Sequence, residues 1–383
     1  MRKGMRVFDA DTHGGPNAEL LEPYLESVIR ERVPDLDAHK RPIRIGLAGE
    51  KREEPYKHNY SFGQGGGWGR DAARWLGEAA PRDNAERHFQ KFMGTRFPTE
   101  GGVWDSDIRT RDMDVEGVDA QLVVTNAVSH PDPEVEAAFI RALHRFMDDF
   151  CKPYPHRLKS MIEVTPRAVD ESVREIKRWA REPWAVAIRP SLPIDYPADH
   201  PDMDPIWKAA DEEGLVVVHH SFSAGYPGYR DLWQNPFLGR MASHPWGGMR
   251  FVAAMVCSGI LDRFPNLNLA ILESGFGWLP FWAKRMDDQV EYVGYVPDLK
   301  HNPSEYFTAG RVFCSIEMHE GAEMVRLVDS LLGDDVLMFG SDYPHAESRY
   351  PSSVDHVLGW EGLRPEQMQK LLWDNAVRAF GEP

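Results

Sequence analysis

Side chains that bind metal ions or transfer protons stand at the ends of several short apolar runs in this sequence of 383 residues. They are Asp11, His13, His219, His220, Glu273, Asp342 and His345. Carboxylate and imidazole donors of this kind suit Zn, Mn, Fe or Ni. One such residue at a strand end is more commonly a helix cap or a hydrogen-bonded loop residue. Because four runs end in these donors, the sequence predicts a metal centre.

The elements that must position these donors are short apolar runs with helical patterns or long loops between them. The runs span residues 6–13, 119–127, 157–164, 185–191, 214–221, 266–274, 311–317 and 335–342. Continuous apolar runs are typical of buried parallel strands. Eight of them in alternation with helices favour an α/β (β/α)₈ TIM barrel, in which active sites lie at the carboxyl ends of the strands. An open doubly wound sheet is the competing fold, but "DADTHGGPN" is not its Gly-rich phosphate turn.

We expect residues 1–383 to form a single barrel domain, with residues 33–105 as an insertion after the first strand and helix. The insertion is polar, Gly-rich and aromatic, as in "SFGQGGGWGRDAARW". Long segments of this kind in compact domains are often functional. The sequence therefore predicts a cap over the barrel mouth, and a flexible surface loop is the alternative.

Composition bounds the partners and the compartment. The formal net charge is -16 and no Lys/Arg-rich run occurs, so we do not expect nucleic acid binding. No stretch approaches the roughly 18 apolar residues of a membrane span. The three cysteines are few and widely spaced, which is typical of a reduced compartment. We expect a cytoplasmic protein that forms a homo- or hetero-oligomer.

The sequence resembles the amidohydrolase superfamily, in the branch that includes aminocarboxymuconate-semialdehyde decarboxylase and resorcylate decarboxylase. The resemblance rests on "DADTH", "RDMDVEGVDAQLVV", "GLVVVHH", "GILDRFPNLNLAILESGFGWLPFWAKRMD", "FGSDYPH" and "DNAVRAFG", and is weakest over residues 33–105. It implies a barrel with a metal site. It places Asp11 and His13 at the family's two-apart ligand pair, His219 at the metal histidine of strand five, and Asp342 at the aspartate of strand eight.

The sequence departs from this family at the end of the sixth strand, where Glu273 stands in place of an acid/base histidine. A glutamate can still transfer protons, and it can also bridge metal ions. The donors exceed the three to five protein ligands that one metal ion uses. This surplus favours two metal ions, Fe/Fe or Mn/Fe, as in the branch's dinuclear oxygenases, over one Zn or Mn ion.

Four further assignments stay open at this level. His220 directly follows His219, so in a regular strand it would face the other way. His244 lies in the long segment after the fifth strand and is either a metal ligand, a catalytic group or a support for a ligand. His345 either binds metal or hydrogen-bonds a ligand. Arg189, at the end of the fourth strand, either clamps a substrate carboxylate or forms a structural ion pair.

The preferred function at this level is a dinuclear non-haem monooxygenase that hydroxylates an aliphatic C–H bond of a small carboxylate-bearing substrate. It would use O₂ and an electron donor that the sequence does not identify. The first alternative is a decarboxylase or hydrolase with one metal ion, in which Glu273 is the acid/base. The second is a non-catalytic partner subunit of a heteromeric complex.

Overall fold

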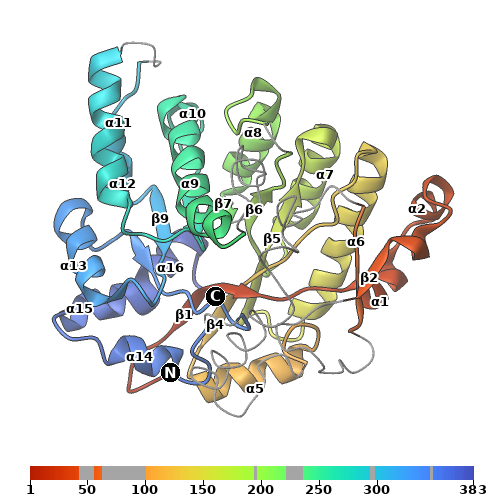
Figure 1. Cartoon of the computed structure of the whole chain (residues 1–383), viewed down its shortest axis with the longest axis horizontal. Helices are drawn as coiled ribbons and strands as arrows, with labels where there is room; N and C mark the ends of the chain where they lie inside the picture. The colour runs from red at the N-terminus through yellow and green to blue at the C-terminus, as the bar shows by residue number, and fades with distance from the viewer. Residues whose placement is uncertain (43–55, 63–100, 194–195, 221–235, 294–297, 346–347) are drawn as a thin grey trace.

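The computed structural model describes residues 1–42, 56–62, 101–193, 196–220, 236–293, 298–345 and 348–383. Its centre is a sheet of 8 parallel strands in the order β1-β4-β5-β6-β7-β8-β9-β10 (Figure 1). Helices surround this sheet, so the (β/α)₈ barrel expected from the sequence is confirmed. Each of the eight apolar runs contains one of these strands.

The strands are β1 (Phe8–His13), β4 (Ala120–Val124), β5 (Leu158–Val164), β6 (Ala185–Pro190), β7 (Val216–His220), β8 (Leu269–Leu272), β9 (Val312–Ser315) and β10 (Leu337–Met338). The main outer helices are α5 (Ser106–Glu116), α6 (Pro133–Cys151), α7 (Val169–Trp179), α8 (Asp204–Glu213), α9 (Pro236–Cys257), α11 (Leu279–Val293) and α13 (Gly321–Leu332). Shorter helices are α1 (Ala18–Leu21), α2 (Ser27–Arg32), α10 (Ile260–Arg263), α12 (Pro303–Thr308), α14 (Ser353–Leu358), α15 (Pro365–Gln369) and α16 (Asn375–Phe380).

Alternate residues of each strand enter two separate apolar cores. In β7, Val216 and Val218 face the barrel interior, whereas Val217 packs in the layer between strands and helices. Because both faces are buried, the strand is apolar throughout and shows no alternation in sequence. Full burial of each such side chain contributes about 1.5–3 kcal/mol.

The barrel closes where the first strand meets the last. Ala10 N donates to the carbonyl of Phe339 at 2.8 Å, and Asp342 N donates to the carbonyl of Asp11 at 2.9 Å. We call this contact between β1 and β10 the seam. At the amino-terminal end of the strands, Trp373 and Phe380 pack on Phe8 and close the barrel floor.

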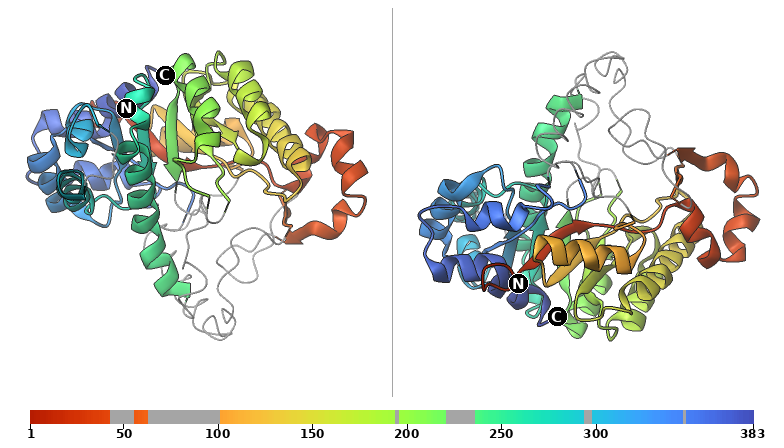
Figure 2. Two further views of the ribbon diagram at one scale, coloured as in Figure 1. Left: turned by 90° about the horizontal axis from the view of Figure 1, so that it is seen from above. Right: turned by 90° about the horizontal axis from the view of Figure 1, so that it is seen from below.

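The chain after β1 leaves the barrel and forms an arm. Helices α1 and α2 lie beside α6 at the edge of the molecule (Figure 2). A short antiparallel pair follows, β2 (Lys40–Pro42) with β3 (His58–Tyr60). Residues 43–55 and 63–100 of the expected insertion lie outside the described residues, so the cap over the mouth stays a prediction.

Among the helices of the described residues, none has both the length and the apolar character that crossing a membrane requires.

Candidate metal centre

Donor atoms from strands that are far apart in the sequence converge at the carboxyl end of the barrel. His13, Glu273, Asp342 and His345 offer atoms within 4.8 Å of one another, and Asp11, His13 and His220 form a second such group. The two groups share His13, so they form one cluster. Its closest pairs are His13 Nε2 with Asp342 Oδ1 at 2.9 Å and His220 Nε2 with Glu273 Oε2 at 3.0 Å.

A bulge in β1 brings Asp11 and His13 to the cluster. Asp9 pairs with Gln121 and Thr12 with Val123, so β1 contains one residue more than β4 between these two pairs. Such an insertion re-aims side chains and is common next to active sites. Thr12 therefore faces outward, where its hydroxyl donates to the carbonyl of Leu122 at 2.8 Å, while Asp11 and His13 face the cluster.

The structure places His220, rather than His219, in the cluster. His220 shares the inward face of β7 with Val216 and Val218, and it pairs with Leu272 of the barrel interior. His219 lies on the opposite face, where its ring stacks on Phe251 with 5.0 Å between centroids. Because successive side chains of a strand alternate in direction, the structure favours His220 over His219 as the metal histidine of this strand, and the ligand assignment itself stays a prediction.

Two of the carboxylates sit on an unusual backbone. Glu273 has φ +46° and Asp342 has φ +59°, the left-handed region that residues other than Gly rarely adopt. Such conformations cost on the order of 1–3 kcal/mol and persist where the surrounding structure enforces them, typically at functional sites. Here both side chains face the cluster, Glu273 directly after β8 and Asp342 in the segment that follows β10.

The donor set fits a metal ion. Asp11 Oδ2 is occupied, because Glu273 N donates to it at 3.0 Å and Ser315 Oγ at 3.3 Å. Asp11 Oδ1 and His13 Nε2 are buried atoms for which the described residues supply no hydrogen-bond partner. Buried polar atoms are normally satisfied, so both point to a missing partner at the cluster centre. Oxygen and imidazole donors suit Mn²⁺ or Zn²⁺.

The electrostatics also call for positive charge at the cluster. Burial lowers the pKa of His220, but the carboxylates of Glu273 and Asp11 outweigh it and raise this pKa to about 10. Burial and Asp342 raise the pKa of Glu273, but His220 and His13 outweigh them, so it lies below its usual range. Burial, with His345 and His220 nearby, lowers the pKa of His13 well below its usual value. The carboxylates thus stabilise the protonated form of His220. A bound metal ion would supply the same positive charge.

Of the remaining predicted histidines, His345 belongs to the cluster on its solvent side and His244 lies at its edge. His345 stacks on His13 with 4.0 Å between ring centroids, and its Nδ1 is 2.7 Å from Asp342 Oδ1. Its side chain is 47% exposed, so it covers the cluster from the solvent side. His244 of α9 lies beside Glu273, with Nδ1 3.8 Å from Oε1. Their roles as ligands stay predictions.

Arg189 lies in the other half of the barrel mouth. Its Nε is 2.7 Å from Glu163 Oε1, and both side chains are buried. The two residues are direct neighbours across β5 and β6. Burial raises the pKa of Glu163 to about 7, although Arg189 opposes that shift. The structural ion pair is the interpretation that this geometry supports.

Sequence reasoning missed two residues that bear on the cluster. Arg109 of α5 is fully buried and donates to the carbonyl of His13 at 2.6 Å and to that of Gly102 at 2.9 Å. Glu317 follows β9, and burial together with Asp342 and Asp11 raises its pKa well above the usual range. A strand-end carboxylate was visible in "RVFCSIE", whereas a helical arginine far along the chain from His13 gave no local signal.

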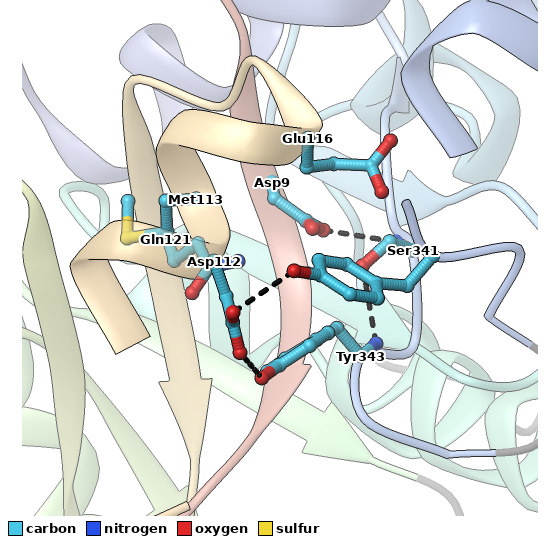
Figure 3. Close-up of a pocket in the computed structure, with 8 residues that line it drawn as sticks. Asp9, Asp112, Met113, Glu116, Gln121, Ser341 and Tyr343 are labelled. Carbon is cyan, nitrogen blue, oxygen red and sulfur yellow. Dashed lines mark hydrogen bonds between the residues drawn. The ribbon is translucent and has the colours of Figure 1, made fainter. Parts of the chain in front are cut away.

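Buried carboxylates also support the loop that carries Asp342 (Figure 3). Asp9 accepts a hydrogen bond from Ser341 N at 2.9 Å. The hydroxyls of Tyr343 and Tyr350 donate to Asp112 at 2.6 and 2.9 Å. These hydrogen bonds connect β1 and α5 to the segment after β10, and so hold the loop that carries Asp342 in place.

Comparison with known proteins agrees with this geometry. The amidohydrolase family model matches residues 68–381, so the chain belongs to the amidohydrolase family. A 2-amino-3-carboxymuconate-6-semialdehyde decarboxylase of Dictyostelium discoideum is 23% identical over 254 residues, which cover 64% of this chain and 68% of that protein.

Two solved structures share the fold over nearly the whole chain. A 5-carboxyvanillate decarboxylase of Novosphingobium aromaticivorans, complexed with manganese and 4-hydroxy-3-methoxy-5-nitrobenzoic acid, has a TM-score of 0.68 and 18% identity, and the match covers 99% of this chain and 97% of that one. An amidohydrolase of Mycobacterium avium subsp. paratuberculosis has a TM-score of 0.73 and 17% identity, and the match covers 99% and 100%.

These comparisons overturn the expected monooxygenase. The relatives with a named activity are decarboxylases, and manganese is the metal in the complex described above. The dinuclear Fe/Fe or Mn/Fe oxygenase predicted from the surplus of donors is therefore wrong. Part of the surplus has a structural reason, since His219 faces away from the cluster and His244 lies at its edge.

Proposed function

We propose that this protein is a decarboxylase that uses one Mn²⁺ or Zn²⁺ ion and releases CO₂ from a small aromatic or unsaturated carboxylic acid. The observation that carries the proposal is the convergence of His13, Glu273 and Asp342, with Asp11 and His220 joined through His13. The named relatives support decarboxylation as the reaction, and membership of this family favours an enzyme over a non-catalytic subunit.

Asp11, His13, His220 and Asp342 would hold the metal ion, and Glu273 lies against the same cluster. When bound, the ion supplies a positive centre that orients the substrate and stabilises negative charge on its oxygen atoms. Ser315 and the backbone of Glu273 fix the carboxylate of Asp11. Arg109 fixes the backbone of His13. These contacts hold the donors before the substrate arrives, which is the preorganisation that catalysis needs.

The reaction breaks the bond between the carboxyl carbon and the neighbouring carbon. CO₂ leaves, the electron pair stays on the neighbouring carbon, and that carbon gains a proton. We assign the proton transfer to Glu273 with His244, whose Nδ1 lies 3.8 Å from Glu273 Oε1. In the family a histidine is the acid/base at the position where this chain has Glu273. His244 beside Glu273 would place an imidazole near that position again.

The test is CO₂ release from a panel of hydroxylated benzoic acids and unsaturated dicarboxylic acids. The protein is assayed after removal of metal and after loading with Mn²⁺ or Zn²⁺, with and without O₂. We expect metal-dependent CO₂ release that is equally fast in the absence of O₂. Neither O₂ nor an electron donor has a role in this reaction. Hydrolysis of ester or amide analogues without CO₂ release from any acid would contradict the proposal.

A further inference from the structure

The guanidinium of Arg189 orients one amide side chain at the barrel mouth. Arg189 Nη1 and Nη2 both donate to Asn126 Oδ1 at 3.3 Å. Arginine has only donors, so the atom of the amide that faces it must be the oxygen. The Nδ2 group of Asn126, with its two N–H donors, therefore points away from Arg189.

Arg189 is itself held in place by a buried neighbour. Its Nε lies 2.7 Å from Glu163 Oε1, in the register pair that joins β5 and β6. His144 Nε2 in turn accepts the backbone N–H of Glu163 at 2.9 Å. The guanidinium is thus held in place before any substrate binds, and a fixed donor loses little entropy on binding.

Asn126 lines a cavity that starts next to the metal centre. The cavity has a volume of about 280 Å³. It is lined by Gly14–Ala18, Leu21, Tyr56, Asn59–Phe62 and Asn126–Ser129. Gly14 directly follows His13, so one wall of the cavity continues from the cluster. An apolar cavity of about 150 Å³ holds a benzene molecule, so this one has room for a substituted ring. Asn126 is exposed and lines this cavity.

We propose that Asn126 is a specificity residue, and that its Nδ2 donates a hydrogen bond to an acceptor oxygen of the substrate other than those of the departing carboxylate. Arg189 is the positioning residue that sets the direction of the amide. This inference rests on the proposed function for the placement of the carboxylate at the metal ion. The substrate class is a small unsaturated acid that carries a hydroxyl, ether or carbonyl oxygen.

The test compares ligands that differ only in that oxygen. Dissociation constants of meta- and para-methoxybenzoate and of the matching ethylbenzoates are measured by calorimetry on the Mn²⁺-loaded full chain. The two members of each pair are similar in size, and only the methoxy member has an acceptor. We expect the wild type to prefer one methoxy isomer roughly threefold to tenfold, the factor of one neutral hydrogen bond.

Asn126→Asp keeps the contact with Arg189 but removes the donor, so we expect the preference to vanish or reverse. Asn268→Asp is the matched control, because Asn268 Oδ1 also accepts from an arginine, Arg311 Nε at 3.0 Å, but precedes β8 at the other end of the barrel. It should keep the preference. The double variant Glu163→Gln/Arg189→Gln frees the amide to flip and should weaken the preference while circular dichroism shows the native fold.

A wild type without methoxy preference, or an Asn126→Asp variant that keeps it, would overturn the inference. A double variant that keeps the preference would remove Arg189 from the positioning role. The measurement is of binding alone, so failure to release CO₂ from any acid would count against the proposed function and leave this assignment standing.

Discussion

The two halves of the barrel mouth handle charge in opposite ways. Strands β7, β8, β10 and β1 carry the metal half, where the carboxylates of Asp11, Glu273 and Asp342 outnumber the available cations. Strands β4, β5 and β6 carry the other half, which we call the recognition half, where Arg189 faces Glu163 in a buried ion pair. The first half calls for a cation, whereas the second already pairs a buried carboxylate with an arginine. We infer from this difference that the negatively charged carboxylate of the substrate binds at the metal half.

The largest expected effect separates the two adjacent histidines of β7. His220→Asn removes a donor of the cluster, so metal content after dialysis and CO₂ release should fall more than 100-fold, beyond the 10–100-fold typical for loss of a supporting residue. His219→Asn is the matched control and should keep its metal. Equal metal loss in both variants would mean that the division of β7 into two faces is wrong.

A smaller effect on metal affinity is expected when Arg109, which supports the backbone of the metal half, is replaced. Arg109→Lys cannot reach the carbonyls of His13 and Gly102 together, so metal affinity should fall about 10–100-fold. Competition with a chelator measures it. Arg311→Lys is the control, since Arg311 caps the carbonyl of Leu267 at 2.9 Å beyond the opposite end of the strands. Comparable loss in the two variants would indicate general destabilisation.

The recognition half should show a different kinetic signature. Arg189→Lys loses the fork that holds Asn126, because lysine is a single point charge. We expect KM to rise about tenfold while kcat changes less than about threefold, the pattern for lost uniform binding. Metal content should stay at the wild-type level. A drop in metal content would show that the two halves are not independent.

The smallest effect concerns pH and the buried carboxylates behind the seam. Burial raises the pKa of Glu116 to about 8, above the roughly 4.3 of an unfolded chain. Between these values the native state binds more protons, so wild-type stability falls as pH rises. Glu116→Gln keeps the acceptor for Val354 N and does not titrate. It should gain roughly 1–4 kcal/mol over wild type at pH 9 and clearly less at pH 5.5. Parallel denaturation profiles at both pH values would contradict this.

The sequence predicted the barrel and most of the cluster, because buried parallel strands and the donors at their ends are local patterns. It did not predict which histidine of β7 faces inward. The run "GLVVVHHS" is apolar on both faces, so nothing in it sets the phase of the strand. The bulge in β1 and the reach of Arg109 depend on contacts with β4 and with the turn after His13. The reaction was mispredicted because a count of donors does not define chemistry on a fold that hosts many activities.

The seam has a consequence for the order in which the chain is made. Asp11 and His13 leave the ribosome with the first strand, but Asp342 follows only with the eighth. A nascent chain that ends before β10 has neither the hydrogen bonds of the seam nor the carboxylate that faces His13. Bringing these ends together carries the loop-closure cost of nearly the whole chain. Capture of the metal ion through Asp342 would therefore follow synthesis of β10 and its contact with β1, so a loaded centre would report that the barrel has closed.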